Sequence, residues 1–255
     1  MTIDETDFLC LATIPKSGTH YTHHFLVNYL LRVQGREPGE TLFSHDAYAV
    51  FPNRRRNYFD LKQPYLPTGP LPPGIRDVVV QHGFANLEGY PGRVIALFRN
   101  PLDYIVSLYH YRHGSRVDET LHVESIAEVT EGFATRWAIA WATLQKLLAT
   151  ATPVLPIRYE DLVRDPTARF RQMLEFAGVP VDQALLERTA EDVRSDRFRH
   201  TAAEKNLNPN FRVPIARDGS IGQWKHEMGE REIQIARQAL ARRRIDLDDL
   251  MADWA

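Results

Sequence analysis

The sequence predicts an α/β fold in which a mostly parallel β-sheet is flanked by helices. Short apolar runs of strand length alternate with longer stretches in which apolar residues recur every three or four positions. The first apolar run is followed by a short loop that contains a glycine, and then at once by such a helical stretch. This alternation is typical of layered proteins in which helices connect parallel strands.

The composition agrees with one large globular domain. Of the 255 residues, 44% are hydrophobic and 25% are charged, which are ordinary values. The length allows a substantial core, and neither a repeat nor a linker divides the chain, so we expect residues 1–255 to form a single domain. The formal net charge of −2 argues against a nucleic-acid or membrane partner, and the oligomeric state stays open.

Cysteine usage and the N-terminal residues predict a cytoplasmic protein. The one cysteine, Cys10, cannot form an intramolecular disulfide, and its place in the first apolar run predicts a buried, inert thiol. The acidic start, Met1–Glu5, does not resemble a signal peptide. No apolar stretch reaches the length that a membrane-spanning helix needs.

The first strand and helix are predicted from the apolar pattern. Residues 8–14 form an apolar run of strand length, and Tyr21, Phe25 and Tyr29 then recur at i, i+4 and i+8 on a buried helix. An irregular stretch from about residue 34 to 74 follows, rich in proline and aromatic residues. Loops of that length inside a domain are usually functional, so we expect a lid or a pocket wall.

The remaining elements follow in alternating order. Residues 78–82 and 94–98 read as buried strands, and Pro101 is well placed to begin the next helix. A strand at residues 154–159 contains Pro156, which predicts a sheet edge or a strand end. Further helices are expected at about residues 126–149, 167–177, 182–193 and 230–243, with a polar loop at 199–222.

The segment Pro15–Thr19, between the first strand and the first helix, predicts a phosphate site. N–H groups at a helix start and the helix dipole both favour an anion, and Lys16 adds a mobile positive charge. The segment lacks the G-x-x-x-x-G-K-[ST] spacing of nucleoside triphosphatases. We therefore expect a phosphate-bearing ligand other than ATP with magnesium.

Four segments, taken in order, resemble the cytosolic-type sulfotransferases that use 3′-phosphoadenosine-5′-phosphosulfate (PAPS). They are the loop Pro15–Thr19, the run Phe98–Asp103 with Ser107, the run Tyr159–Leu162, and the stretch Arg217–Lys225, which has the pattern R-x-G-x-x-G-x-W-K. The resemblance extends from residue 14 to 225. It implies the family's single α/β domain, related to nucleotide kinases, and transfer of a sulfuryl group from PAPS to a hydroxyl of a small-molecule acceptor without a metal.

The resemblance also implies which residues bind the cofactor. The loop is expected to hold the 5′-phosphosulfate, Arg99 and Ser107 the 3′-phosphate, and Tyr159 the adenosine side. The cofactor-binding residues are Lys16, Ser17, Gly18, Thr19, His20, Tyr21, Arg99, Ser107, Tyr159, Arg217, Asp218 and Gly219. Independently of the family, Arg99 follows a strand and precedes a helix start, where a phosphate can meet both a guanidinium and backbone N–H groups.

Four positions depart from the family pattern. Tyr21 stands where a tryptophan usually stacks on adenine, and His20 replaces a second threonine. Asp218 occupies a position that is commonly basic, and Val80 replaces the lysine of a Lys-Thr-His sequence. The first three departures bear on the affinity for the cofactor, and with Val80 any help from the family's lysine is missing or supplied by another group.

His82 and Lys16 are the predicted catalytic residues. The resemblance places the family's general base at His82, which ends a strand, where α/β sheets build their active sites. An imidazole titrates near neutral pH, which suits a base. Lys16 would stabilise the negative charge that develops on the oxygen bridging to the leaving phosphate.

Other polar residues have ordinary structural explanations. His20 and His24 share a helix face as zinc ligands can, but no third ligand is evident, so no metal is predicted. His110 and His113 are expected to be structural or to lie at the pocket rim. The run Arg54–Arg56 is more often a solvated surface cluster, and the alternative is recognition of an anionic group on the acceptor.

Two other functions compete with sulfuryl transfer. The first is a P-loop kinase or NTPase. Two features argue against it: the loop lacks the first glycine of the G-x-x-x-x-G-K-[ST] motif, and no magnesium-binding aspartate is evident. The second is a non-catalytic nucleotide-binding protein of the same fold. The joint presence of Lys16, His82, Arg99 and Ser107 argues against it.

Overall fold

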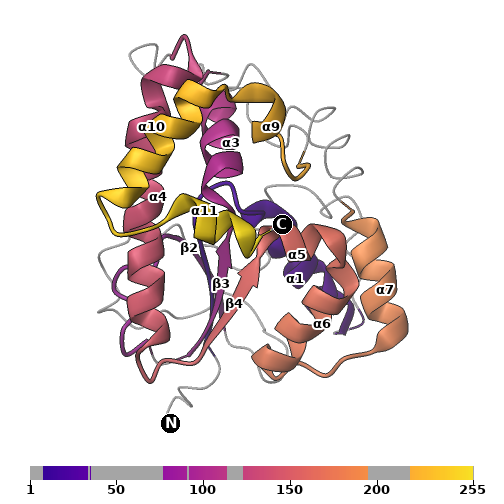
Figure 1. Ribbon diagram of the computed structural model, residues 1–255. Coiled ribbons are helices and arrows are strands. Elements are labelled where there is room, and N and C mark those ends of the chain that lie inside the picture. The colour runs from indigo at the N-terminus through magenta and orange to yellow at the C-terminus, as the bar shows by residue number, and fades with distance from the viewer. Residues whose placement is uncertain are drawn as a thin grey trace.

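A computed structural model describes residues 8–33, 35, 77–90, 92–113, 123–194 and 219–254. Its centre is a four-stranded parallel sheet in the order β2-β1-β3-β4 (Figure 1). The strands are β1 (Phe8–Thr13), β2 (Asp77–His82), β3 (Arg93–Phe98) and β4 (Val154–Arg158). The predicted α/β class with a parallel sheet and flanking helices is confirmed.

The register of the strands gathers four chain segments at one edge of the sheet. Thr13 pairs with His82 on one side and with Leu97 on the other, and Phe98 pairs with Arg158. The carboxyl ends of all four strands therefore meet. The strand after β1 is added on one side of it, and β3 is then added on its other side, so the strand order reverses at β1. Open α/β sheets bind ligands at such a switch point.

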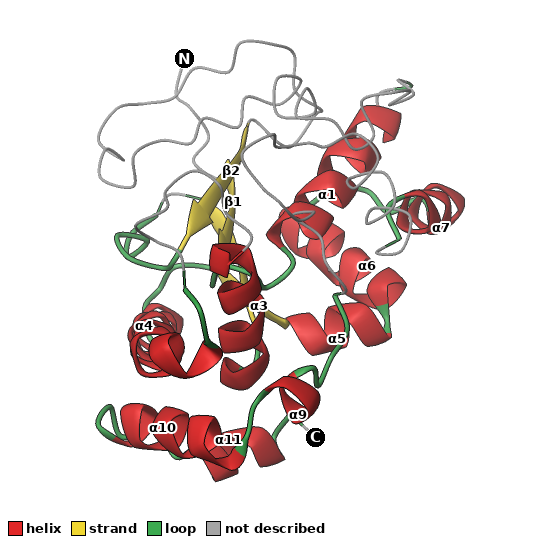
Figure 2. Cartoon of the chain, turned by 90° about the horizontal axis from the view of Figure 1, so that it is seen from above, coloured by secondary structure: helices red, strands yellow, loops and turns green. Residues whose placement is uncertain are grey.

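The helices cover both faces of the sheet, as Figures 1 and 2 show. On one face lie α1 (Thr19–Val33), α5 (Tyr159–Arg164), α6 (Pro166–Ala177) and α7 (Gln183–Asp192). On the other lie α3 (Pro101–His113), α4 (Ile126–Leu148), α9 (Trp224–Glu227), α10 (Glu230–Ala241) and α11 (Leu247–Ala252).

Successive side chains of the inner strands belong alternately to two hydrophobic cores, one on each face of the sheet. Leu9 and Leu11 of β1 belong to the core under α1 and α6, whereas Cys10 and Ala12 belong to the core under α3 and α4. This is the two-residue period of a strand that is covered on both faces. Burial raises the pKa of the Cys10 thiol to about 12, which agrees with an inert thiol.

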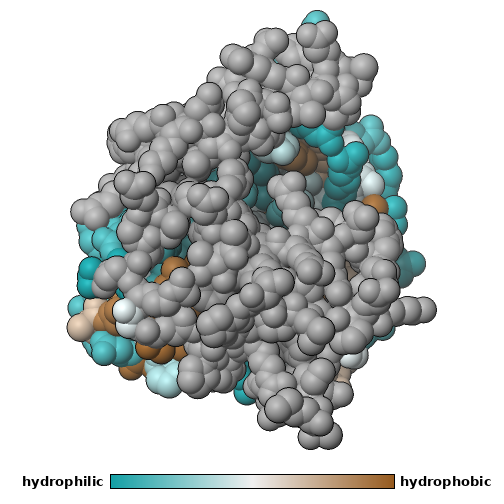
Figure 3. Space-filling model, turned by 180° about the vertical axis from the view of Figure 1, so that it is seen from behind, coloured by the Kyte–Doolittle hydropathy of each residue, from teal (hydrophilic) through white to brown (hydrophobic). Residues whose placement is uncertain are grey.

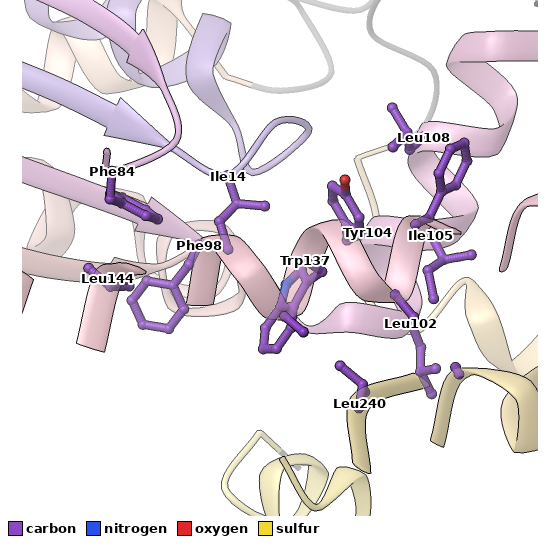
Figure 4. Close-up of a cluster of buried hydrophobic side chains, with 14 of the residues drawn as sticks. Ile14, Phe84, Phe98, Leu102, Tyr104, Ile105, Leu108, Trp137, Leu144 and Leu240 are labelled. Carbon is purple, nitrogen blue, oxygen red and sulfur yellow. The ribbon is translucent and has the colours of Figure 1, made fainter. Parts of the chain in front are cut away.

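The two cores differ in their aromatic packing. In the first, the rings of Phe25 and Phe170 stack with centroids 3.6 Å apart. In the second, Trp137 is fully buried, and its ring stacks on that of Trp141 at 5.3 Å (Figure 4 shows Trp137 among its neighbours). The Trp137 Nε1–H group donates a hydrogen bond of 2.8 Å to the carbonyl oxygen of Arg99, so this core also fixes the end of β3.

The surface of the described residues carries few large apolar side chains. Val33, Ile139 and Leu148 are the exposed ones in these ranges. Most of the described residues visible in Figure 3 are hydrophilic, and hydrophobic ones gather mainly at its lower left. Within the described residues, no helix combines the length and the apolar character that crossing a membrane requires.

The predicted elements agree with the structure except at their ends and in short helices. The chain turns into α5 at Tyr159, where the strand had been expected to continue, and α5, α9 and α11 were not predicted. β4 does lie at an edge of the sheet, as Pro156 indicated. Apart from Gly35, the stretch 34–74, with the run Arg54–Arg56, lies outside the described residues.

Candidate active site

The loop between β1 and α1 has an unusual backbone. Lys16 and Gly18 have φ values of 69° and 87°, in the left-handed region that favours glycine. The N–H of Ser17 donates to the carbonyl of Ile14 at 3.2 Å, which closes the turn before α1 begins at Thr19. The first N–H groups of a helix lack intrahelical acceptors, so this turn aims hydrogen-bond donors at the carboxyl edge of the sheet.

Close packing of Tyr159 explains why residue 18 is a glycine. A Cβ atom on Gly18 would lie 2.9 Å from Cδ2 of Tyr159, closer than real Cβ atoms approach. Tyr159 is the first residue of α5, and its hydroxyl donates a 2.6 Å hydrogen bond to the carbonyl of Gly219. The Tyr159 ring therefore links the first loop to the C-terminal segment.

Lys16 lies against an aromatic side chain of α3. Its Nζ atom is 4.7 Å from the centroid of the Tyr111 ring, within the range of a cation–π interaction. The ring holds the ammonium at the carboxyl edge of the sheet and close to α3. Sequence reasoning chose Lys16 but gave no role to Tyr111, because a tyrosine inside a helix carries no distinctive signal.

Arg99 is buried between two segments that are distant in sequence. It is 3% exposed, its guanidinium carbon lies 4.5 Å from the centroid of the Tyr159 ring, and its Nη2 donates a 2.7 Å hydrogen bond to the carbonyl of Ser220. The Nη2 atom is also 3.7 Å from Oδ2 of Asp103, an ion pair. Ser107 lies one turn of α3 beyond Asp103 and is half-buried.

Asp103 organises this part of the site and was not singled out from the sequence. Its carboxylate accepts hydrogen bonds from the N–H groups of Gly222 at 2.8 Å and Trp224 at 3.2 Å. It also accepts from Nδ2 of Asn100, which in turn donates to Glu160. A carboxylate in the first turn of a helix is the available signal, since it complements the helix dipole.

His82 is exposed at the end of β2 and touches the first strand. Its Nδ1 atom is 3.0 Å from Oγ1 of Thr13, and that oxygen is 2.8 Å from Oγ1 of Thr19. The predicted base is therefore joined by two hydrogen bonds to the start of α1. Sequence reasoning missed Thr13, which reads only as the last residue of a strand.

The remaining predicted cofactor residues divide into three groups. Tyr21 is 7% exposed and packs its ring 5.3 Å from that of Phe170, so it forms part of the core and offers little ring surface to a ligand. His20 is half-buried at the start of α1, and Gly219 lies next to Tyr159. Arg217 and Asp218 lie outside the described residues.

The other histidines of interest occupy the helices. His23 is 1% exposed, and burial, followed by the charges of His24 and His20, holds the pKa of His23 well below its usual value. His110 is hydrogen-bonded to Glu227 of α9, and Nδ1 of His113 is 2.8 Å from the carbonyl oxygen of Val123. In the described part of the chain, no three histidine, cysteine, aspartate or glutamate side chains gather as metal ligands would.

A parallel sheet with a glycine-containing loop and an arginine at its carboxyl edge offers backbone N–H groups and positive charge to an anionic ligand, with a histidine beside them. Residues 6–254 match the family described as the sulfotransferase domain, and the chain belongs to this family.

The chain resembles individual members of the family only distantly. It is 24% identical to cytosolic sulfotransferase 14 of Arabidopsis thaliana across 68% of this chain and 54% of that protein, so it spans about half of that relative. It is 24% identical to sulfotransferase 1A1 of Rattus norvegicus across 86% of this chain and 78% of that protein. The chain superposes on the crystal structure of mouse sulfotransferase SULT7A1 complexed with PAP (3′-phosphoadenosine-5′-phosphate) with a TM-score of 0.68. The two are 17% identical, and the superposition covers 99% of this chain and 90% of that one. That similarity shows a shared fold.

Proposed function

We propose that the chain transfers a sulfuryl group from PAPS to a hydroxyl of a small-molecule acceptor. The observation that carries the proposal is the gathering of Lys16, His82 and Arg99 at one edge of the sheet. Two cations at separate positions suit a ligand with two phosphate groups, and a histidine beside the first position suits proton removal from an acceptor.

The residues present fit an adenosine bisphosphate. Oγ of Ser17 and Nε of Arg99 are both buried, and neither has a hydrogen-bond partner in the described residues. Buried polar groups are normally paired, so phosphate oxygens at these two places would satisfy them. The use of PAPS that the sequence resemblance implies, and the PAP bound to the mouse sulfotransferase, support the same ligand.

Each residue has a definite task in this proposal. When bound, PAPS supplies the activated sulfuryl group and a phosphate leaving group. His82 accepts the proton of the acceptor hydroxyl, a role that typically contributes about 10² to 10⁴ in rate. Lys16 neutralises the charge that develops on the oxygen of the leaving phosphate, and Arg99 holds the 3′-phosphate.

The test is sulfuryl transfer from radiolabelled PAPS to a panel of hydroxylated compounds. We expect His82→Ala to abolish turnover and to leave the affinity for 3′-phosphoadenosine-5′-phosphate (PAP) nearly unchanged, because the base contacts the acceptor. Replacing His226, which is exposed on α9, with alanine is the matched control and should leave turnover intact. A His82→Ala protein with near-normal turnover would show that another group is the base.

The kinase alternative predicts a different outcome in the same preparation. A P-loop kinase would bind ATP with magnesium and lose turnover when the metal is chelated. We expect tight binding of PAP, weak binding of ATP, and turnover that a chelator leaves unchanged. Thermal stabilisation by magnesium-ATP but not by PAP would favour the kinase, and PAP binding without turnover of any acceptor would favour a non-catalytic nucleotide-binding protein.

A further inference from the structure

Three side chains form a short hydrogen-bonded row from the start of α1 to the predicted base. Thr13 is fully buried between the other two, with Oγ1 at 2.8 Å from Oγ1 of Thr19 and at 3.0 Å from Nδ1 of His82. The backbone fixes this arrangement, because Thr13 and His82 are register partners in adjacent strands and the N–H of Gly83 donates to the carbonyl of Thr13 at 2.7 Å.

The Thr13 hydroxyl has a single proton, so the row can be ordered in only two ways. In one order, Thr13 donates to Nδ1 of His82 and accepts from Thr19, which leaves the imidazole proton on Nε2. In the other, Thr13 donates to Thr19 and accepts from Nδ1–H of His82, which leaves the lone pair on Nε2. Only the second order gives His82 an Nε2 atom that can accept a proton from a substrate.

An anion in the loop selects between these orders. Thr19 is the first residue of α1, at the position where the loop would hold a phosphate. A phosphate oxygen is an acceptor only, so the Thr19 hydroxyl must donate to it, and its Oγ1 can then only accept from Thr13. Thr13 in turn accepts from Nδ1–H of His82.

We propose that an anion bound in the loop sets the tautomer of His82 through Thr19 and Thr13, and thereby prepares Nε2 as the base. Thr13 is then a positioning residue that acts through His82. The inference rests on the proposed function and adds to it a coupling between cofactor binding and the readiness of the base. The net number of protons is unchanged, since each hydroxyl only rotates while His82 releases one proton from Nε2 to solvent and takes one up from solvent at Nδ1.

The experiment measures the tautomer directly, by ¹⁵N NMR of histidine-labelled protein with the His82 signals assigned by comparison with His82→Ala. Titration with PAP should shift the wild-type population toward the Nδ1–H form. Thr13→Val, which keeps the shape and removes the hydroxyl, should abolish that shift and lower kcat by roughly tenfold to a hundredfold, part of what a general base contributes. Thr13→Ser should restore both.

The outcomes separate the inference from the proposed function. If PAP binds and the tautomer of His82 stays the same, or shifts equally in Thr13→Val, the inference is overturned while PAPS dependence stands. If PAP does not bind, the proposed function fails and the inference falls with it. A loss of turnover in Thr13→Ser equal to that in Thr13→Val would show that the methyl packing matters, not the hydroxyl, and would also overturn the inference.

Discussion

The two candidate phosphate sites are built in opposite ways. The loop between β1 and α1 offers backbone N–H groups and hydroxyls, and it turns through left-handed φ values at Lys16 and Gly18. The site at the end of β3 centres on one side chain, Arg99, which is buried and already donates to the carbonyl of Ser220. The first site is a preformed backbone cradle, and the second is a buried cation that needs the C-terminal segment beside it.

This difference indicates which changes each site tolerates. Backbone donors do not depend on side-chain identity, so a cradle can accept departures such as His20 and still bind an anion. The Arg99 site depends on particular side chains, because Asp103 anchors the amides of Gly222 and Trp224. Substitutions at the first site should therefore act on the rate or on the backbone, and those at the second on affinity.

Among substitutions at the two candidate phosphate sites, the largest effect is expected from Lys16. Lys16→Ala should lower kcat by about 10² to 10³, as is typical when one group that stabilises developing charge is removed. Lys16→Arg should not restore the rate, because a planar guanidinium can stack on the Tyr111 ring but does not bring the compact point charge of an ammonium to the leaving oxygen. Steady-state kinetics with labelled PAPS measures both, and full rescue by arginine would contradict the assigned role.

The next effect concerns the preference for a bisphosphate. Arg99→Ala should lower the affinity for PAP by roughly ten- to a hundredfold while leaving the affinity for AMP almost unchanged, since charge-assisted contacts are each worth about 1.5–3 kcal/mol. Arg93 is the matched control, because it begins the same strand at the opposite end and donates to the carbonyl of Ala177. Calorimetry that finds equal losses for PAP and AMP would contradict a separate 3′-phosphate site.

A smaller effect tests the shape of the cradle. Gly18→Ala places a Cβ at a φ of 87° and 2.9 Å from the Tyr159 ring, whereas Gly89→Ala meets only a φ of 71° with open space around it. The left-handed conformation alone costs about 1–2 kcal/mol. Gly89→Ala should lose about that much unfolding free energy, and Gly18→Ala should lose more and also bind PAP less tightly. Equal stability losses with unchanged PAP binding would argue against the packing explanation.

Much of the fold could be predicted because its signals are local. Apolar runs and helical periodicity gave the four strands and the long helices, as the bounds of β3 and α4 show. The short helices were not predicted, since a six-residue element such as α5 has too few turns to show the helical period of apolar residues. The sequence pattern extends β4 to Tyr159, one residue too far, because a buried aromatic residue is equally compatible with the end of a strand and with the start of a helix.

The candidate site was only partly predictable, for a different reason. Lys16, His82 and Arg99 lie at strand ends or in the loop after a strand, in recognisable motifs, but their partners come from tertiary contacts that no spacing reveals. Thr13 meets His82 across 69 positions of sequence, and Asp103 meets Gly222 across 119. Tyr21, which the resemblance places beside the cofactor, also packs its ring against Phe170, a contact that its motif does not indicate.

The smallest effect concerns the helix that carries the cradle. His23 of α1 is buried, and burial, then the charges of His24 and His20, hold its pKa well below the ordinary 6.5. Above about pH 6.5 the residue is neutral in both the folded and the unfolded chain, so it adds no pH dependence. Below that value the unfolded chain binds a proton that the folded chain does not, and stability falls by up to about 1.4 kcal/mol per pH unit.

His23→Gln should therefore flatten the decline of the melting temperature between pH 6.5 and pH 5, whatever its effect on stability at pH 7.5. The comparison uses slopes because the substitution also changes packing in the buried helix, which shifts all values together. His226→Gln, at an exposed position on α9, should keep the wild-type slope. Identical slopes for His23→Gln and the wild type would mean that the proton taken up on unfolding belongs to another group. If His23→Gln flattens the decline of the melting temperature and the variant also binds PAP at lower pH than the wild type does, then the neutral His23 limits the stability of the loop between β1 and α1 in acid.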